Sequence, residues 1–181
     1  MDDRLKQGLA PVGSGAARLL LLGSLPGEAS LVAQRYYAHP RNQFWTLLGA
    51  AIDEPLDALG YGQRLERLAQ RQVALWDVIG TARRHGSLDG AIRQPSANPL
   101  ARFVASHPAL EAIAFNGHTA ARLGRAALAG VAGVVLVDLP SSSPAYTLPV
   151  AQKLERWRAI GRFAGLAPPP PPDQRGGDER P

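Results

Sequence analysis

Four short apolar runs, each followed at once by loop-forming residues, constrain the fold of this chain more than any other feature. They span residues 18–23, 73–78, 112–115 and 134–137, and segments with helical spacing separate them. A strand that is apolar at consecutive positions is typical of a parallel sheet covered by helices on both faces. We therefore expect an α/β fold with three layers, α/β/α, and a four-stranded parallel central sheet.

Length and composition indicate one folded domain with an extension at each end. The 181 residues suffice for a single substantial core. Residues 1–15 are polar and glycine-rich, so we expect a flexible N-terminal arm before a folded domain over residues 16–166. Residues 167–181 include five consecutive prolines, which predicts a disordered Pro-rich tail.

The composition excludes several classes of chemistry. The sequence has no cysteine, which excludes disulfides, a thiol nucleophile, cysteine-ligated zinc and iron–sulfur clusters. Its four histidines lack the spacing of metal ligands, so we expect neither a metal site nor any other cofactor. The acidic start and the short apolar runs predict no signal peptide and no membrane partner. We expect a cytoplasmic protein of a bacterial cell.

The charge of the chain is compatible with two explanations. The net charge is +5, and 18 arginines beside two lysines supply the positive side chains. Arginine binds phosphate through a planar fork of donors, which favours a polyanionic partner. A high-GC genome enriches arginine as well, and composition alone does not separate the two.

The loop after the first apolar run is the first candidate binding element. Gly23, Pro26 and Gly27 end the run abruptly, and they offer free backbone N–H groups and close approach to a ligand. An ordinary strand-to-helix turn explains the same residues. Open α/β sheets bind ligands at the carboxyl ends of their strands, where the four loops should meet on one rim.

The side chains expected on this rim suit a planar heterocycle. The sequence has no Walker loop, no dinucleotide fingerprint and no Gly-x-Ser-x-Gly elbow. An aromatic ring can stack on a base while an amide reads the edge of that base. The residues that offer aromatic, amide or hydroxyl groups are Asn42, Phe44, Asn116, Ser141 and Ser143.

Five motifs follow one another along the chain in a specific order. They are Gly23-Ser24-Leu25-Pro26-Gly27, Tyr37-x-His39-Pro40-Arg41-Asn42-x-Phe44-Trp45, Leu75-Trp76-Asp77-Val78, Phe115-Asn116-Gly117 and Leu139-Pro140-Ser141-Ser142-Ser143-Pro144-Ala145. In this order they resemble the uracil-DNA glycosylase superfamily, and most closely its hypoxanthine (deoxyinosine) branch, called family 6. The resemblance spans residues 18–163, most of the chain.

The resemblance implies an activity and a partner. It implies the three-layer fold, a glycosylase-like catalytic domain over residues 16–166, and a monomeric enzyme of base excision repair. The substrate would be double-stranded or single-stranded DNA containing a deaminated base, which is flipped out of the helix and released by hydrolysis. Hypoxanthine is the first candidate base, and uracil and xanthine are further ones.

The resemblance also implies where the hydrolytic water is held. Other branches carry Asp, Asn or Glu two residues after the first glycine of the first motif, where this chain has Leu25. Leucine can neither activate nor position water. The hypoxanthine branch implies that Asn42 takes over this role, holding the water in line with the bond to be broken. Asn42 fits the N-cap of the following helix equally well.

The remaining implied roles concern the base and the DNA backbone. Phe44 would stack on the flipped base, and Asn116 would accept from a ring N–H and donate to the neighbouring carbonyl, a pattern that adenine inverts. Of Phe44 and Trp45, we expect one in the core and one at the site. The implied base-binding residues are Gly23, Ser24, Leu25, Phe44 and Asn116, and the implied DNA-binding residues are Ser141, Ser142, Ser143 and Arg41.

Some residues near these motifs keep alternative roles. Arg41, Arg83 and Arg84 are either phosphate contacts or solvated surface, and Asp77 could cap the following turn. His39 and His118 are either structural or acids near the base. A wedge that enters the duplex would come from Tyr146 or Leu148.

Two other functions fit the same motifs. One is a nucleic-acid-binding module without catalysis, which the leucine at position 25 favours. The other is a hydrolase of free nucleosides, which the arginine-rich charge opposes. Cleavage of the DNA strand through a Schiff base would require a lysine, and none lies near the motifs in the sequence, so we expect a monofunctional glycosylase.

Overall fold

The central sheet contains the four predicted parallel strands and one more. The computed structural model describes residues 5–165. The sheet has the order β2-β4-β3-β7-β8, in which the last four are parallel and β2 runs antiparallel to β4. The strands are β2 (Val12–Gly13), β3 (Leu19–Gly23), β4 (Val73–Asp77), β7 (Ala112–Asn116) and β8 (Val135–Leu139). The expected parallel core is confirmed, with an antiparallel strand added at one edge.

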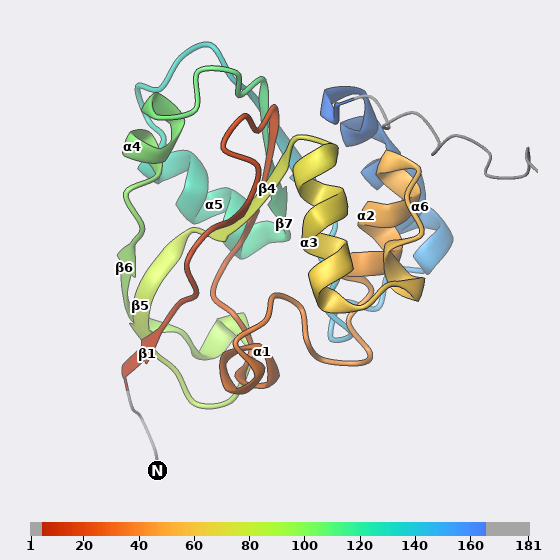
Figure 1. The fold of residues 1–181 in the computed structure, drawn as a ribbon. Helices are drawn as coiled ribbons and strands as arrows, with labels where there is room; N and C mark the ends of the chain where they lie inside the picture. The colour runs from red at the N-terminus through yellow and green to blue at the C-terminus, as the bar shows by residue number, and fades with distance from the viewer. Residues whose placement is uncertain (1–4, 166–181) are drawn as a thin grey trace, which may run out of the picture.

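Helices cover both faces of this sheet, as the three-layer prediction requires (Figure 1). One layer contains α2 (Phe44–Ile52), α3 (Tyr61–Gln70), α6 (Val150–Trp157) and the 3₁₀ helix η3 (Arg158–Phe163). The other contains α4 (Leu100–Ala105) and α5 (His118–Ala127). The short elements α1 (Glu28–Ala33), η1 (Leu56–Ala58) and η2 (Asp89–Ala91) lie in the connections.

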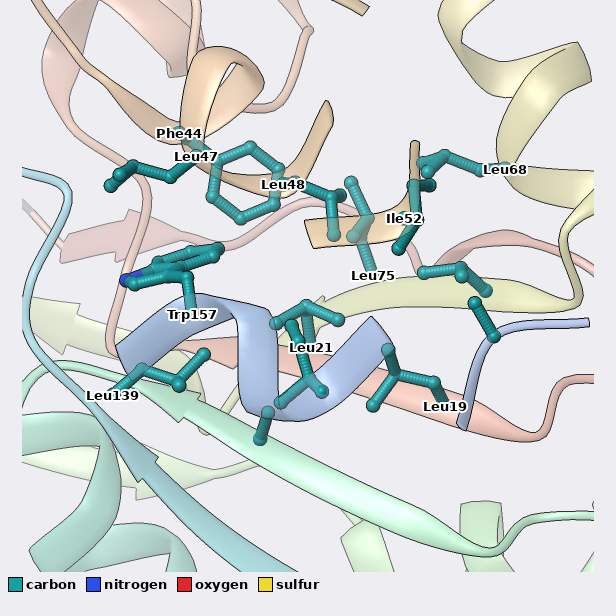
Figure 2. Close-up of a cluster of buried hydrophobic side chains, with 14 of the residues drawn as sticks. Leu19, Leu21, Phe44, Leu47, Leu48, Ile52, Leu68, Leu75, Leu139 and Trp157 are labelled. Carbon is teal, nitrogen blue, oxygen red and sulfur yellow. The ribbon is translucent and has the colours of Figure 1, made fainter. Parts of the chain in front are cut away.

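The two layers explain why the first strand is apolar at every position. Leu19 and Leu21 pack against α2 and Trp157 in the first layer, as Figure 2 shows. Leu20 and Leu22 point the other way and pack with Phe115 and the helices of the second layer. Successive side chains of a strand alternate between faces, so a strand buried on both sides needs consecutive apolar residues.

A second sheet of three antiparallel strands corrects part of the expectation. It contains β1 (Leu5–Gln7), β5 (Ile79–Arg83) and β6 (Arg93–Ala97), in the order β1-β5-β6. Residues 5–15 are therefore not a flexible arm, because β1 pairs with β5 and β2 pairs with β4. Strand β6 is a further element that the four apolar runs did not predict, and all five of its residues are exposed. The predicted tail at 167–181 lies outside the described residues.

The β5–β6 connection brings a further loop to the carboxyl end of the central sheet. Residues 84–92 fold back over the loop that follows β3. Ser24 Oγ donates to Asp89 Oδ1 at 2.7 Å, and the Glu28 backbone N–H donates to Ser87 Oγ at 2.9 Å. These two hydrogen bonds from the β5–β6 connection hold the loop that follows β3 in place.

No helix among residues 5–165 has the length and apolar character needed to cross a membrane.

Candidate active site

A cavity of about 630 Å³ opens where β3, β4 and β7 end. This volume is typical of small-ligand sites, which measure about 300–1,000 Å³. The cavity is lined by every site residue expected from the sequence except Phe44. These are Gly23, Ser24, Leu25, Arg41, Asn42, Asn116, Ser141, Ser142 and Ser143, and they are joined by Tyr36, Tyr37, Asp77 and the 87–89 segment.

Gly23 forms the floor of the cavity between two polar residues. It pairs with Asp77 across β3 and β4, and Asn116 ends the strand on its other side. A Cβ atom on Gly23 would lie 2.5 Å from Asp77 Oδ1 and 3.0 Å from Tyr37 Oη. Only glycine leaves room here for the Asp77 carboxyl and the Tyr37 hydroxyl.

Arg84 supports the loop that follows β3 from the interior of the protein. It is fully buried, and its guanidinium donates to the backbone carbonyls of Leu25, at 3.2 Å, and of Pro26. Arg84 is therefore a support for the loop and not a phosphate contact. The Leu25 side chain is buried against Ile79 and Ala82, which agrees with a packing role for this position.

Asn42 lies one residue before Gln43, the N-cap of α2, and it lines the cavity. Its Oδ1 accepts a hydrogen bond from the Phe44 backbone N–H at 3.0 Å, at the point where α2 begins. The Asn42 backbone N–H donates to the His39 carbonyl at 2.9 Å. These two bonds hold the amide in place while it lines the cavity. An amide oxygen has two lone pairs, so Oδ1 can still accept from a second donor such as water.

The aromatic surface at the cavity belongs to Tyr37 and not to Phe44. Phe44 is fully buried and packs against Trp157. Tyr37 lies over it with ring centroids 3.5 Å apart and planes 7° apart, and Tyr37 lines the cavity. Phe44 is therefore too buried to stack on a ligand, and the ring that lines the cavity is Tyr37, with Phe44 packed behind it. Trp45 is buried as well, so neither member of the Phe44–Trp45 pair reaches the site.

The Asn116 amide is locked in one orientation. Its Nδ2 donates to Tyr37 Oη at 3.2 Å and to Ser142 Oγ at 2.8 Å. Its Oδ1 accepts the Ser142 backbone N–H at 2.8 Å. Both N–H groups are thus engaged within the protein, and the second lone pair of Oδ1 is the remaining hydrogen-bonding capacity.

Residues 141–143, here called the serine loop, comprise one buried serine and two that are accessible from the cavity. Ser142 is fully buried and serves Asn116, so it is not available to a phosphate. Ser141 and Ser143 are half-buried and line the cavity, and Arg41 is exposed at its edge. The accessible residues remain suited to a phosphate, whereas Ser142 positions the Asn116 amide.

A buried lysine lies directly beneath this loop, contrary to the expectation from the sequence. Lys153 on α6 is 1% exposed, and its Nζ donates to Gln43 Oε1 at 3.0 Å and to the Tyr146 carbonyl at 2.8 Å. Burial lowers the pKa of Lys153. The lysine ties the serine loop to the start of α2, next to Asn42.

The buried hydroxyl and carboxyl groups around the floor have shifted pKa values. Burial, followed by the charge of Asp77, raises the pKa of Tyr37, so its hydroxyl keeps its proton. Burial, and then the charge of Asp89, raise the pKa of Asp77 to about 7, although the Arg84 guanidinium and the Tyr36 hydroxyl oppose the rise. This carboxyl therefore keeps its proton to a higher pH than an exposed aspartate does.

Of His39 and His118 only His39 lines the cavity, and of the two wedge candidates only Tyr146 does. His39 lines the cavity, and its Nδ1 accepts the Arg41 backbone N–H at 3.2 Å, whereas His118 is exposed outside the lining. Tyr146 is 47% exposed at the cavity mouth. Leu148 is half-buried and does not line the cavity.

Sequence reasoning missed three residues of the site. Tyr37 stands inside a recognised motif, but its backbone has φ of 52°, and this left-handed conformation, which aims the ring, leaves no signal in the sequence. Asp77 could have been found as a polar residue at the end of an apolar strand. Lys153 is more than a hundred positions from Gln43, and only the fold brings the two together.

Known proteins match this chain over most of its length. The family model of the uracil DNA glycosylase superfamily matches residues 10–161. A protein of Methanosarcina acetivorans, named hypoxanthine DNA glycosylase, is 35% identical over 158 residues, which cover 87% of this chain and 99% of that protein. A protein of Methanosarcina barkeri with the same name is 40% identical over 112 residues, which cover 62% of this chain and 71% of that protein.

A solved structure agrees with these matches. The solution NMR structure of a Methanosarcina acetivorans protein, presented as a candidate uracil DNA glycosylase, superposes with a TM-score of 0.79 at 34% identity. The match covers 88% of this chain and 98% of that one. The fold, the cavity at the strand ends and these relatives define an enzyme of the DNA glycosylase class. The chain belongs to the uracil DNA glycosylase superfamily.

Proposed function

We propose that the chain releases hypoxanthine from deoxyinosine in DNA, as a step of base excision repair, with uracil and xanthine as further substrates. The main observation in support of the proposal is that Asn42, Asn116 and Tyr37 all line one cavity, with the Tyr37 ring stacked on Phe44. Two relatives named hypoxanthine DNA glycosylase support the choice of base. The net charge of +5 suits a DNA substrate.

The flipped base would stack on the Tyr37 ring. Phe44 backs this ring at 3.5 Å, so the stacking surface is rigid before the base arrives. Base–aromatic stacking contributes about 1–3 kcal/mol per base and does not depend strongly on which base is present. Tyr37 therefore supplies affinity, and the choice among bases falls to the polar floor.

Asn116 would read one edge of the base. Because Ser142 and Tyr37 engage both of its N–H groups, Oδ1 faces the base as an acceptor. Hypoxanthine and uracil carry a ring N–H that can donate to this oxygen. Adenine has an unprotonated ring nitrogen at that position, which leaves the two acceptors facing each other.

Asn42 would hold the attacking water. The second lone pair of Oδ1 accepts one water hydrogen and directs the water oxygen toward C1′ of the sugar. The bond from C1′ to the base breaks, its electron pair leaves with the base, and the water oxygen bonds to C1′. The proton released by the water balances the charge on the base, so the products are neutral hypoxanthine and an abasic site.

The rim of the cavity would hold the DNA around the flipped nucleotide. Ser141, Ser143 and Arg41 offer hydroxyl and guanidinium donors to phosphates. Tyr146 is exposed at the mouth and would fill the gap left in the duplex.

The direct test uses duplexes that carry a single deoxyinosine or deoxyuridine. The purified protein is incubated with each, and alkali then converts abasic sites to strand breaks. We expect breaks at deoxyinosine and none in an undamaged duplex. Salt-sensitive binding without base release would indicate a non-catalytic binding module, and turnover of free inosine without DNA would indicate a nucleoside hydrolase; either result would refute the proposal.

A further inference from the structure

One carboxyl of the cavity has no role in the reaction outlined above. Asp77 is 3% exposed and lines the cavity beside Gly23. Among the described residues no partner hydrogen-bonds to Asp77 Oδ2, which is fully buried. The carboxyl therefore does not cap the turn after β4, one of the roles that the sequence left open. A buried carboxyl oxygen without a partner carries a free-energy penalty that packing alone does not offset.

The surroundings of this carboxyl favour its protonated form. Burial and the Asp89 carboxylate raise its pKa to about 7, against the Arg84 guanidinium and the Tyr36 hydroxyl. The other ionisable group at hand, Tyr37, keeps its proton, because burial and Asp77 raise its pKa. A neutral carboxylic acid can donate one hydrogen bond, which an ionised carboxylate cannot.

The base-reading floor lacks a donor that such an acid could supply. A hypoxanthine or uracil edge presents an N–H and a carbonyl oxygen side by side. Asn116 can accept from the N–H, but both of its own N–H groups are engaged by Tyr37 and Ser142. The carbonyl oxygen of the base needs another donor, and Asp77 ends the neighbouring strand, on the other side of Gly23.

We propose that Asp77, in its protonated form, donates a hydrogen bond to the carbonyl oxygen of the flipped base and completes the recognition that Asn116 begins. This inference rests on the proposed function. The base leaves with the electron pair of the broken bond, and negative charge spreads onto its carbonyl oxygen. A donor aimed at that oxygen stabilises the transition state more than the bound substrate, whereas an ionised Asp77 would repel it.

The inference predicts how the reaction responds to pH. Single-turnover release of hypoxanthine should be constant below the titration of Asp77 and should fall about tenfold for each pH unit above it. Asp77→Asn supplies an amide N–H that does not titrate, so its rate should lack this decline. Asp77→Ala removes the donor and should lower the rate at pH 6 by about 100-fold.

The experiment measures single-turnover rates from pH 5.5 to 9 on a duplex with one deoxyinosine, for the wild type and both variants. Asp57→Asn, an exposed carboxyl outside this cavity, is the matched control and should keep the wild-type profile. Thermal melting establishes that each variant is folded. A second readout is binding of a duplex with uncleavable 2′-fluoro-deoxyinosine, which should weaken above pH 7 in the wild type but not in Asp77→Asn.

These experiments distinguish an incorrect role for Asp77 from an incorrect proposed function. A wild type that neither releases hypoxanthine nor prefers the 2′-fluoro-deoxyinosine duplex to its adenine counterpart refutes both. An active wild type whose pH profile survives in Asp77→Asn refutes the role of Asp77 alone. So does an Asp77→Ala variant within threefold of the wild-type rate combined with a large loss in Tyr37→Phe, since the Tyr37 hydroxyl would then be the donor.

Discussion

Tyr37 lies flat on Phe44, with ring centroids 3.5 Å apart and planes inclined by 7°. The two rings lie only seven positions apart in the sequence, but their surroundings differ. Phe44 is fully buried, whereas Tyr37 lines the cavity. This pair joins the core of the domain to the proposed base-binding surface.

Replacing the two rings should therefore have separable effects. Tyr37→Leu removes the stacking surface and the hydroxyl that accepts from Asn116, and it should lower base release by roughly 10–100-fold, with a smaller loss of stability than Phe44→Leu because Tyr37 is only half-buried. Phe44→Leu disturbs the core and should lower the free energy of unfolding by roughly 1–3 kcal/mol. Kinetics on a deoxyinosine duplex and urea unfolding measure the two. Equal loss of activity and stability in Tyr37→Leu would contradict a stacking role.

Gly23 should tolerate no side chain. In Gly23→Ala the new Cβ would lie 2.5 Å from Asp77 Oδ1, so the carboxyl must move or the strand end must shift. We expect loss of base release and a lower melting temperature. Gly62→Ala is the matched control, because that glycine is exposed on α3 with no atom in the way, and alanine favours a helix by about 1 kcal/mol. Wild-type activity in Gly23→Ala would show that the floor is less crowded than described.

Asp77 should make the stability of the protein depend on pH. Its pKa is raised to about 7 in the folded state from 3.8, so the folded state holds a proton that the unfolded state has lost between these values. The penalty of the buried carboxyl is absent below pH 3.8, grows as the pH rises toward 7, and is constant above. At about 1.4 kcal/mol per pKa unit it reaches on the order of 4 kcal/mol.

Asp77→Asn removes this penalty, so its advantage over the wild type should grow from pH 4 to pH 7. Urea unfolding at a series of pH values measures the difference. A wild type that gains stability relative to Asp77→Asn over the same range would mean that the carboxyl is ionised and paired in the folded protein.

Lys153 should support the serine loop without forming a covalent intermediate. Its Nζ is buried and donates to Gln43 and to the Tyr146 carbonyl, which leaves it unsuited to attack a sugar. We expect no strand cleavage without alkali and no borohydride-trapped complex with DNA. Lys153→Met should loosen the loop and weaken binding of the 2′-fluoro-deoxyinosine duplex. Trapping in the wild type that Lys153→Met abolishes would instead identify Lys153 as a nucleophile.

The sequence allowed the central sheet and its helices to be predicted, because strands buried on both faces need consecutive apolar residues such as Leu19–Leu22. It did not reveal β1 and β6, whose residues are mostly exposed and whose pairing depends on backbone groups. The rim loops could be predicted from strand direction. Which aromatic ring faces the cavity could not, since that depends on the backbone conformation at Tyr37.

The polar network was also out of reach of the sequence. Asn116 could be chosen from its motif, but its fixed orientation depends on Ser142, which lies 26 residues further along. The sequence left Arg84 as either a phosphate contact or a surface residue, and only the fold shows that it donates to the Leu25 and Pro26 carbonyls. Burial of charged groups depends on tertiary contacts and has no periodic signature.

The most direct test of the account separates the two roles of Asn42. Its Oδ1 accepts the Phe44 N–H in the turn that leads into α2, and a serine hydroxyl can accept the same hydrogen bond. Asn42→Ser should therefore melt like the wild type and bind the 2′-fluoro-deoxyinosine duplex. Its single-turnover rate of hypoxanthine release should nevertheless be lower by about 100-fold or more, because the water loses its amide. A rate within threefold of the wild type would show that Asn42 only supports the turn that leads into α2.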